Sequence, residues 1–104
     1  FGINDTVGYK VRTYTLNYLF ETGLIDKIDF LKIDIEGAEL LALEGISDEN
    51  LMKVKTISME YHHSHFQWDE NIRANMITRL NKLGFNSMLY NTSTENLQMI
   101  HFTR

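Results

Sequence analysis

The chain has 104 residues, 43% of them hydrophobic and 23% charged, with a formal net charge of -4 at neutral pH. This composition is typical of one soluble globular domain, and the acidic balance argues against nucleic acid or an anionic membrane as the main partner. The absence of cysteine excludes disulfides and thiolate zinc sites, and no apolar run approaches the roughly 18 residues of a membrane span, so we expect a cytoplasmic protein.

The first third of the chain predicts an edge strand, a short helix and a buried strand. Residues 9–14 carry a weak strand pattern, and Thr15 is a suitable N-cap for a helix that Gly23 ends. Residues 28–35 are almost continuously apolar, which predicts a parallel strand buried on both faces of a sheet.

The middle of the chain predicts a further helix and a second strand. Residues 38–44 carry leucines at helical spacing before Gly45, and residues 47–53 form a polar connection with room for one helical turn. Residues 54–61 are rich in Val, Thr, Ile and Tyr, which favours a strand. Because the connection between the two strands is too long for a tight hairpin, it suits a crossover between parallel strands.

The last part of the chain predicts an amphipathic helix and a hairpin. Residues 68–83 place apolar side chains on one stripe, and Gly84 is a natural residue to follow the helix. That stripe consists of Ile72, Met76, Leu80 and Leu83, with Ile77 beside it. Residues 85–90 and 97–103 predict antiparallel strands joined by a polar loop. The predicted fold class is therefore α/β, with parallel strands, crossover helices and a C-terminal antiparallel hairpin.

Ionisable residues gather where the two predicted parallel strands end. Asp34 and Glu36 follow the first strand, and Glu60 and His62 end the second. Ligands bind beyond the carboxyl ends of strands in open α/β sheets, so these side chains are candidates for one cavity. Two carboxylates and an imidazole suit proton abstraction from a hydroxyl group, or a site for a hard cation.

Each candidate also has a structural interpretation. Asp34 can cap the following helix, Glu36 can favour its first turn, and Glu60 can form a structural ion pair. We expect Glu39 to lie on a solvated helix face.

The cluster of His62, His63 and His65 suggests a metal site. Neighbouring side chains of an extended chain point to opposite faces, so His62 and His63 cannot both reach one ion without a bend. We therefore assign no metal ligands and keep His62 as a residue lining the candidate site.

Three blocks of sequence resemble the FkbM-type methyltransferases. They are the run from Ile28 to Glu39, IDFLKIDIEGAE, the Leu-Glu-Gly of residues 43–45, and ISMEYH over residues 57–62, and TLNYLF over residues 15–20 adds a fourth block. The resemblance implies an S-adenosylmethionine-dependent enzyme with a Rossmann-like class I fold that O-methylates a sugar or another small-molecule hydroxyl. By position, Asp34 resembles the residue that contacts the methyl donor or orients the acceptor, Glu60 and His62 would line the acceptor side, and Glu36 would assist.

The chain departs from that family in its first part. The resemblance implies a glycine-rich loop and an acidic ribose-binding residue, and neither is present. The chain resembles the C-terminal portion of a methyltransferase domain, and its start at Phe1 rather than Met fits a piece of a longer protein. We expect weak or absent S-adenosylmethionine binding. We also expect an unpaired edge along residues 28–35, which would lead to self-association or to pairing with a missing segment.

Two other function classes remain open from the residues. A non-catalytic binding or assembly module can derive from such a fold. A metal-dependent hydrolase using Asp34, Glu60 and the histidines is the third interpretation.

Overall fold

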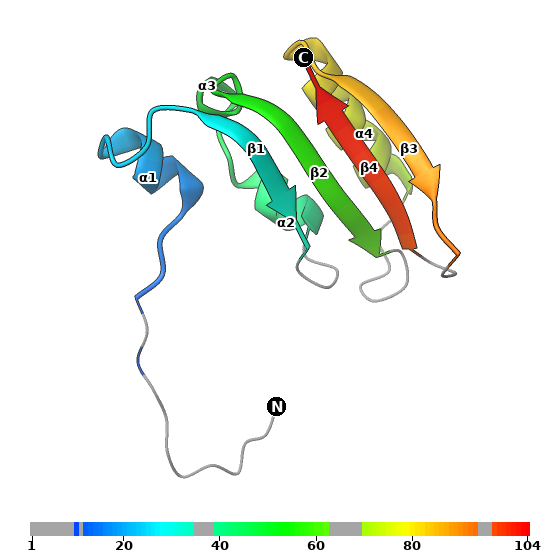
Figure 1. The fold of residues 1–104 in the computed structure, drawn as a ribbon, viewed down its shortest axis with the longest axis horizontal. Coiled ribbons are helices and arrows are strands. Elements are labelled where there is room, and N and C mark those ends of the chain that lie inside the picture. Colours follow the sequence, from blue (N-terminus) through cyan, green and yellow to red (C-terminus); the bar gives the residue numbers. More distant parts are fainter. Residues whose placement is uncertain (1–9, 11, 35–38, 63–69, 94–96) are drawn as a thin grey trace, which may run out of the picture.

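The computed structural model describes residues 10, 12–34, 39–62, 70–93 and 97–104 and shows a mixed α/β arrangement (Figure 1). The elements follow each other as α1 (Leu16–Glu21), β1 (Ile28–Ile33), α2 (Glu39–Glu44), α3 (Asp48–Leu51), β2 (Val54–His62), α4 (Glu70–Lys82), β3 (Asn86–Asn91) and β4 (Leu97–Thr103). The four strands form one sheet in the order β1-β2-β4-β3.

The sheet is partly parallel, as predicted. β1 and β2 run parallel, with Ile28 opposite Val54 and Ile33 opposite Met59. β4 lies between β2 and β3 and is antiparallel to both. β3 therefore points the same way as β1 and β2, and the predicted C-terminal hairpin is confirmed.

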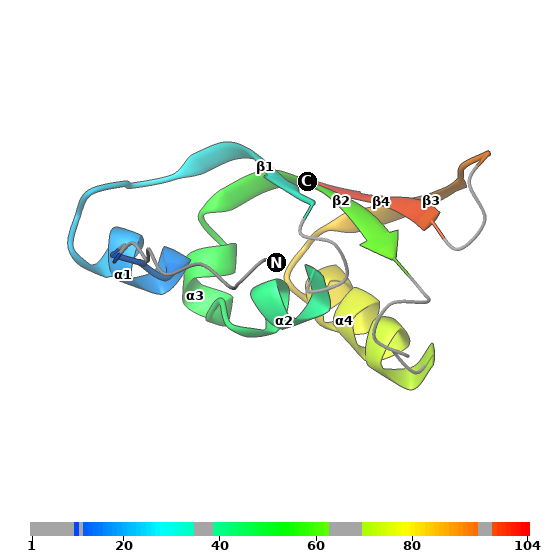
Figure 2. The same cartoon turned by 90° about the horizontal axis from the view of Figure 1, so that it is seen from below.

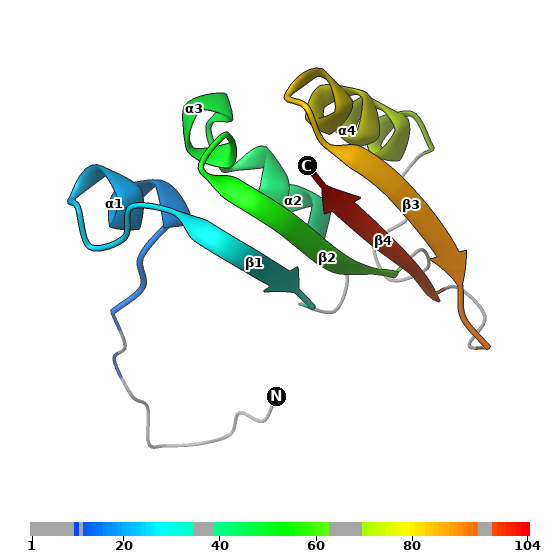
Figure 3. The same cartoon turned by 45° about the horizontal axis from the view of Figure 1, so that its top comes forward.

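All four described helices lie on the same side of the sheet, as the view from below and the tilted view show (Figures 2 and 3). This arrangement contradicts the prediction that β1 is buried on both faces. Ile33 points to the helices and is 7% exposed, whereas Phe30 points the other way and is 58% exposed. The apolar run was long enough for a doubly covered strand, but the described residues provide a helix layer on one side only.

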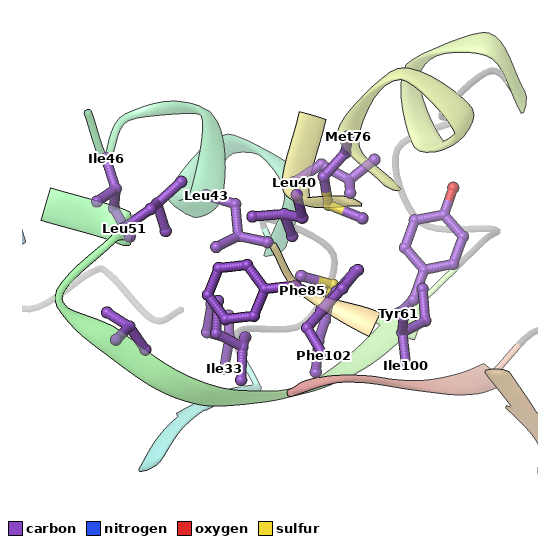
Figure 4. Close-up of a cluster of buried hydrophobic side chains, with 14 of the residues drawn as sticks. Ile33, Leu40, Leu43, Ile46, Leu51, Tyr61, Met76, Phe85, Ile100 and Phe102 are labelled. Atoms are coloured by element: carbon purple, nitrogen blue, oxygen red, sulfur yellow. The ribbon is translucent and has the colours of Figure 1, made fainter. Parts of the chain in front are cut away.

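The core lies between the sheet and the helices (Figure 4). Strand side chains that include Ile33, Ile100 and Phe102 face Leu43 and Met76 of the helices. Leu43, Ile100 and Phe102 are fully buried, and each such side chain contributes roughly 1.5–3 kcal/mol through removal from water. The predicted stripe of α4 supplies part of this core through Met76 and Leu80.

Local signals set the ends of the helices as the sequence predicts. Thr15 caps α1, since its Oγ1 accepts a hydrogen bond from the backbone N–H of Tyr18 at 3.0 Å. Gly23 follows α1 and Gly84 follows α4, with φ angles of 79° and 98°. Both glycines occupy the left-handed region that residues with a Cβ rarely adopt.

Two local predictions are wrong in the described residues. Residue 10 and residues 12–14 form no strand, because this segment pairs with no neighbour in the sheet. Glu39 is 1% exposed rather than solvated. It shares the buried face of α2 with Leu40 and Leu43, while Leu41 points outward, and it has an interaction partner.

The C-terminal Arg104 ties three elements together. Its guanidinium donates hydrogen bonds to the carbonyl oxygens of Leu51 at 2.7 Å, Val54 at 2.9 Å and Leu83 at 2.5 Å. The same group lies 3.9 Å from the ring centroid of Phe85. One side chain thus satisfies carbonyls at the end of α3, the start of β2 and the end of α4.

We expect Arg104→Ala to lower the free energy of unfolding by about 1–3 kcal/mol, because three carbonyls lose a charged donor and Phe85 loses its cation contact. Urea unfolding followed by circular dichroism measures the change. Arg104→Lys should recover little of the loss, since an ammonium group cannot reproduce the planar fork. Full recovery in the lysine variant would contradict the geometric explanation.

A second polar network holds α1 against the junction of α2 and α3. The Asn17 side chain donates to the carbonyl oxygen of Gly45 at 2.9 Å. Its Oδ1 accepts hydrogen bonds from the backbone N–H of Ser47 at 3.1 Å and from Nδ2 of the buried Asn50 at 2.7 Å. These hydrogen bonds link α1 to the other helices, in addition to the packing of Phe20 in the core.

Arg79 forms a similar link from α4. Its guanidinium donates to the carbonyl oxygens of Leu43 at 3.1 Å and Ile46 at 2.6 Å, and its Nε contacts Asp48 at 2.7 Å. These contacts join α4 to the end of α2 and the start of α3.

Replacing Asn17 with alanine should cost about 1–3 kcal/mol of stability, because the buried Asn50 amide loses its acceptor. The exposed Glu21 on the same helix offers a matched control, and Glu21→Ala should change stability by less than about 0.5 kcal/mol. Equal midpoints of urea unfolding for the two variants would show that the network does not hold α1.

Candidate functional site

The carboxyl ends of β1 and β2 lie side by side at one edge of the sheet. The last pair in the register of the two strands joins Ile33 to Met59, so Asp34 and Glu60 are the next residues along the chain after each of them. Hydrogen-bonded strands are about 4.8 Å apart, which brings these two carboxylate-bearing residues to the same rim. The expected juxtaposition of Asp34 and Glu60 is therefore confirmed at the level of the backbone.

Both residues belong to the face of the sheet that carries no helix in the described part of the chain. We call this the open face and define it by Phe30, Lys32, Ser58, Glu60 and His101. Side chains alternate between the two faces of a strand, and Ile33, Met59 and Ile100 occupy the helix side. One row inside the rim, Lys32 lies opposite Ser58, and Ser58 lies opposite His101.

Asp34 is exposed and lines a groove along the outer side of β1. This edge groove has a volume of about 740 Å³ and runs between β1, α1 and the end of α2. Its lining consists of Thr15, Leu16, Leu31, Lys32, Ile33, Asp34, Leu41, Ala42, Gly45 and Ile46. Asp34 thus belongs to the rim end of a mainly apolar groove and is exposed to solvent.

The other predicted site residues are described to different extents. Glu60 is half-buried on β2, lies opposite Met99 of β4 and has an interaction partner. The backbone of His62 ends β2 opposite Leu97, at the same rim as Asp34. Glu36, His63 and His65 lie outside the described residues. Within the described ranges, no group of three or more His, Asp or Glu residues is placed to hold a metal ion.

A chain of polar side chains on the helix side of the same rim was not predicted from the sequence. Arg73 of α4 donates to Oε1 of Gln98 at 2.5 Å, and Nε2 of Gln98 donates to Oδ1 of Asn91 at 3.1 Å. The guanidinium of Arg73 also lies 5.8 Å from the ring centroid of Tyr61. These residues come from four different elements, so no spacing along the chain reveals that they meet.

His101 is the other residue that sequence reasoning passed over. It sits between Ser58 and Met88 in the register of the sheet, and its ring meets that of Tyr90 with centroids 5.4 Å apart. A single histidine in a strand is no functional signal by itself. Its place on the open face depends on the insertion of β4 between β2 and β3.

The arrangement offers three kinds of chemistry at one rim. Asp34 and Glu60 can accept a proton or orient a hydroxyl group, Arg73 carries a fixed positive charge on the helix side, and the edge groove offers apolar surface. None of the helices in the described part of the chain has the length and apolar character needed to cross a membrane.

Comparison with known proteins shows the family of the chain. No curated protein and no solved structure matches the chain significantly. The family model of the methyltransferase FkbM domain matches residues 1–87. Since that match covers most of the sequence, the chain belongs to the FkbM methyltransferase family.

Proposed function

We propose that this chain forms the acceptor side of an S-adenosylmethionine-dependent O-methyltransferase that acts on a sugar or another small-molecule hydroxyl. The observation that carries the proposal is the parallel pairing of β1 and β2, which brings Asp34 and Glu60 to one rim in a member of the FkbM family. A Rossmann-like fold, of which the described sheet would be the C-terminal portion, is part of the same proposal.

Asp34 is the proposed base or orienting residue. It is exposed at the carboxyl end of β1, so a hydroxyl group of the acceptor can donate a hydrogen bond to its carboxylate. As the acceptor oxygen forms its bond to the methyl carbon, the hydroxyl proton passes to this carboxylate. Glu60 and His62 are proposed to line the acceptor side, with Glu36 close to Asp34 in sequence.

Among the described residues, Asp34 suits the methionine portion of the cofactor. When bound, S-adenosylmethionine would supply a methyl group attached to a sulfonium. Transfer of this methyl group breaks its carbon–sulfur bond and leaves S-adenosylhomocysteine. Asp34 can accept a hydrogen bond from the ammonium group of the methionine portion, which suits a carboxylate at the carboxyl end of a strand. The remaining binding energy has to come from other groups, since the 104 residues contain no glycine-rich loop.

Asp34→Asn should lower the rate of S-adenosylmethionine-dependent methyl transfer by about 10²–10⁴-fold, because the amide cannot take the hydroxyl proton. The assay uses the full-length gene product. It measures the S-adenosylhomocysteine that forms in the presence of a panel of sugar and small-molecule hydroxyl acceptors. Asp29→Asn is the matched control, since Asp29 is also an exposed aspartate of β1 but lies far from the rim.

Two outcomes of that assay would count against the proposal. Unchanged turnover in Asp34→Asn would exclude a catalytic role for its charge. No turnover with any acceptor, in a protein that also fails to bind the cofactor, would favour a non-catalytic assembly module.

Cofactor binding by the 104-residue chain alone should be weak. Isothermal titration calorimetry with S-adenosylhomocysteine is expected to give a dissociation constant no tighter than about 1 mM, which corresponds to about -4 kcal/mol. Micromolar binding would show that these residues hold the cofactor without a glycine-rich loop. In that case Asp34→Asn should weaken it by roughly tenfold, through loss of one charge-assisted hydrogen bond.

A further inference from the structure

Three polar side chains on the helix side of the rim form one hydrogen-bonded series. Arg73 of α4 donates to Oε1 of Gln98 on β4 at 2.5 Å, and Nε2 of Gln98 donates to Oδ1 of Asn91 on β3 at 3.1 Å. We call these three residues the Arg73 network. Its parts come from one helix and two strands, and α4 lies behind β4 and β3 in Figure 1. Asn91 is the last residue of β3, so the network ends at the same rim as Asp34.

Chemistry fixes the direction of the Arg73 network. A guanidinium group has only donors, so Gln98 has to turn its Oε1 toward Arg73. Nε2 of Gln98 therefore points to Asn91, which accepts the hydrogen bond with its Oδ1. Asn91 is exposed, and in the described part of the chain no residue accepts a hydrogen bond from its Nδ2. The network therefore presents the two N–H groups of this Nδ2 to a ligand at the carboxyl end of β3.

The positive charge of Arg73 strengthens these donors. The guanidinium lies 5.8 Å from the ring centroid of Tyr61, which is buried in the core. A charge at the start of a hydrogen-bonded series polarises the bonds that follow, so each later N–H becomes a better donor. The strongest partner for such an N–H is an ionised oxygen, as in a carboxylate or a phosphate. The end of the network at Asn91 is therefore suited to an anionic group.

The rim is asymmetric in charge. Asp34 and Glu60 follow the last pair of β1 and β2, whereas the Arg73 network joins α4 to β4 and β3. An anionic group is repelled by the two carboxylates and attracted by the network. Because neighbouring strands are about 4.8 Å apart and the order is β1-β2-β4-β3, β1 and β3 lie three spacings, or about 14 Å, from each other. A ligand that contacts both ends of the rim is therefore longer than a single sugar ring.

We propose that the acceptor is an extended anionic saccharide, an inference that rests on the proposed function. The hydroxyl group that is methylated meets Asp34, and a carboxylate or phosphate group about 10–15 Å away accepts hydrogen bonds from Asn91. At this separation the anionic group belongs to a second unit of the acceptor and not to the methylated ring. The same charges orient the acceptor, because the reversed orientation brings the anionic group to Asp34.

Matched acceptors test the charge of the second unit. Initial rates are measured with the full-length gene product and S-adenosylmethionine, and each sugar of the panel is offered in three forms. The methyl glycoside is neutral, the nucleoside diphosphate sugar carries phosphate, and the disaccharide with glucuronic acid carries a carboxylate. We expect kcat/KM to be at least about tenfold higher for one of the charged forms than for the methyl glycoside, which is the effect of one charge-assisted hydrogen bond. The preferred form identifies the anionic group.

Asn91→Asp tests whether Asn91 makes this distinction. Aspartate keeps an oxygen that can accept from Gln98, but it replaces the two donors with a repelling charge. The preference for the charged acceptor should disappear, mainly through a higher KM, since binding energy is lost in the ground state and the transition state alike. Asn86→Asp is the matched control, because Asn86 is an exposed asparagine at the other end of the same strand and its variant adds the same charge. This control should keep the preference.

The outcomes separate this inference from the proposed function. Equal kcat/KM for neutral and charged forms in the unmodified protein, or a preference that survives in Asn91→Asp, would overturn the inference and leave methyl transfer in place. A preference lost equally in Asn86→Asp would also overturn it, since the effect would then be one of net charge. No methyl transfer to any acceptor would remove the proposed function and the inference with it.

Discussion

The parallel pairing of β1 with β2 is the constraint on which the site depends. Parallel strands need a crossover, and here α2 and α3 provide it on one face of the sheet. The crossover brings the chain back to the end of the sheet at which β1 began. Both strands therefore end at the same rim. Asp34 and Glu60 follow the last pair of the two strands and so come to the same rim, although they are far apart in sequence. An antiparallel arrangement of the same two strands would have placed them at opposite ends.

The contacts of Arg104, Asn17 and Arg79 lie away from the rim, whereas the hydrogen bonds of Arg73, Gln98 and Asn91 lie at the rim itself. Arg104 ties the end of α4 to the start of β2, while Asn17 and Arg79 join the helices around the α2–α3 junction. These side chains satisfy carbonyls and amides that helix ends leave open. The rim with Asp34 and Glu60 carries exposed and half-buried charges instead. This division leaves the rim free to be shaped by loops and ligands while contacts away from it hold the layers together.

Covering the sheet on one face only has two consequences. The first is that Lys32, Ser58 and His101 share an open face with the candidate site residues. The second is that the edge groove lies between β1 and the helices α1 and α2. Both features follow from where the helices lie rather than from any one side chain. They also explain why β1 carries an exposed phenylalanine.

The sequence alone determined the local elements, because their signals act within a few residues. Thr15, Ser47, Gly23 and Gly84 set helix ends through their own hydrogen bonds or dihedral angles, and strand alternation marked the hairpin. It also pointed to the family through a continuous motif. Only the tertiary structure decided the burial of Glu39, the exposure of Phe30 and the meeting of Arg73 with Gln98. Those outcomes depend on which face of the sheet the helices lie on and on the insertion of β4 between β2 and β3. Because such contacts join segments that are far apart in the chain, the spacing of residues within one segment does not predict them.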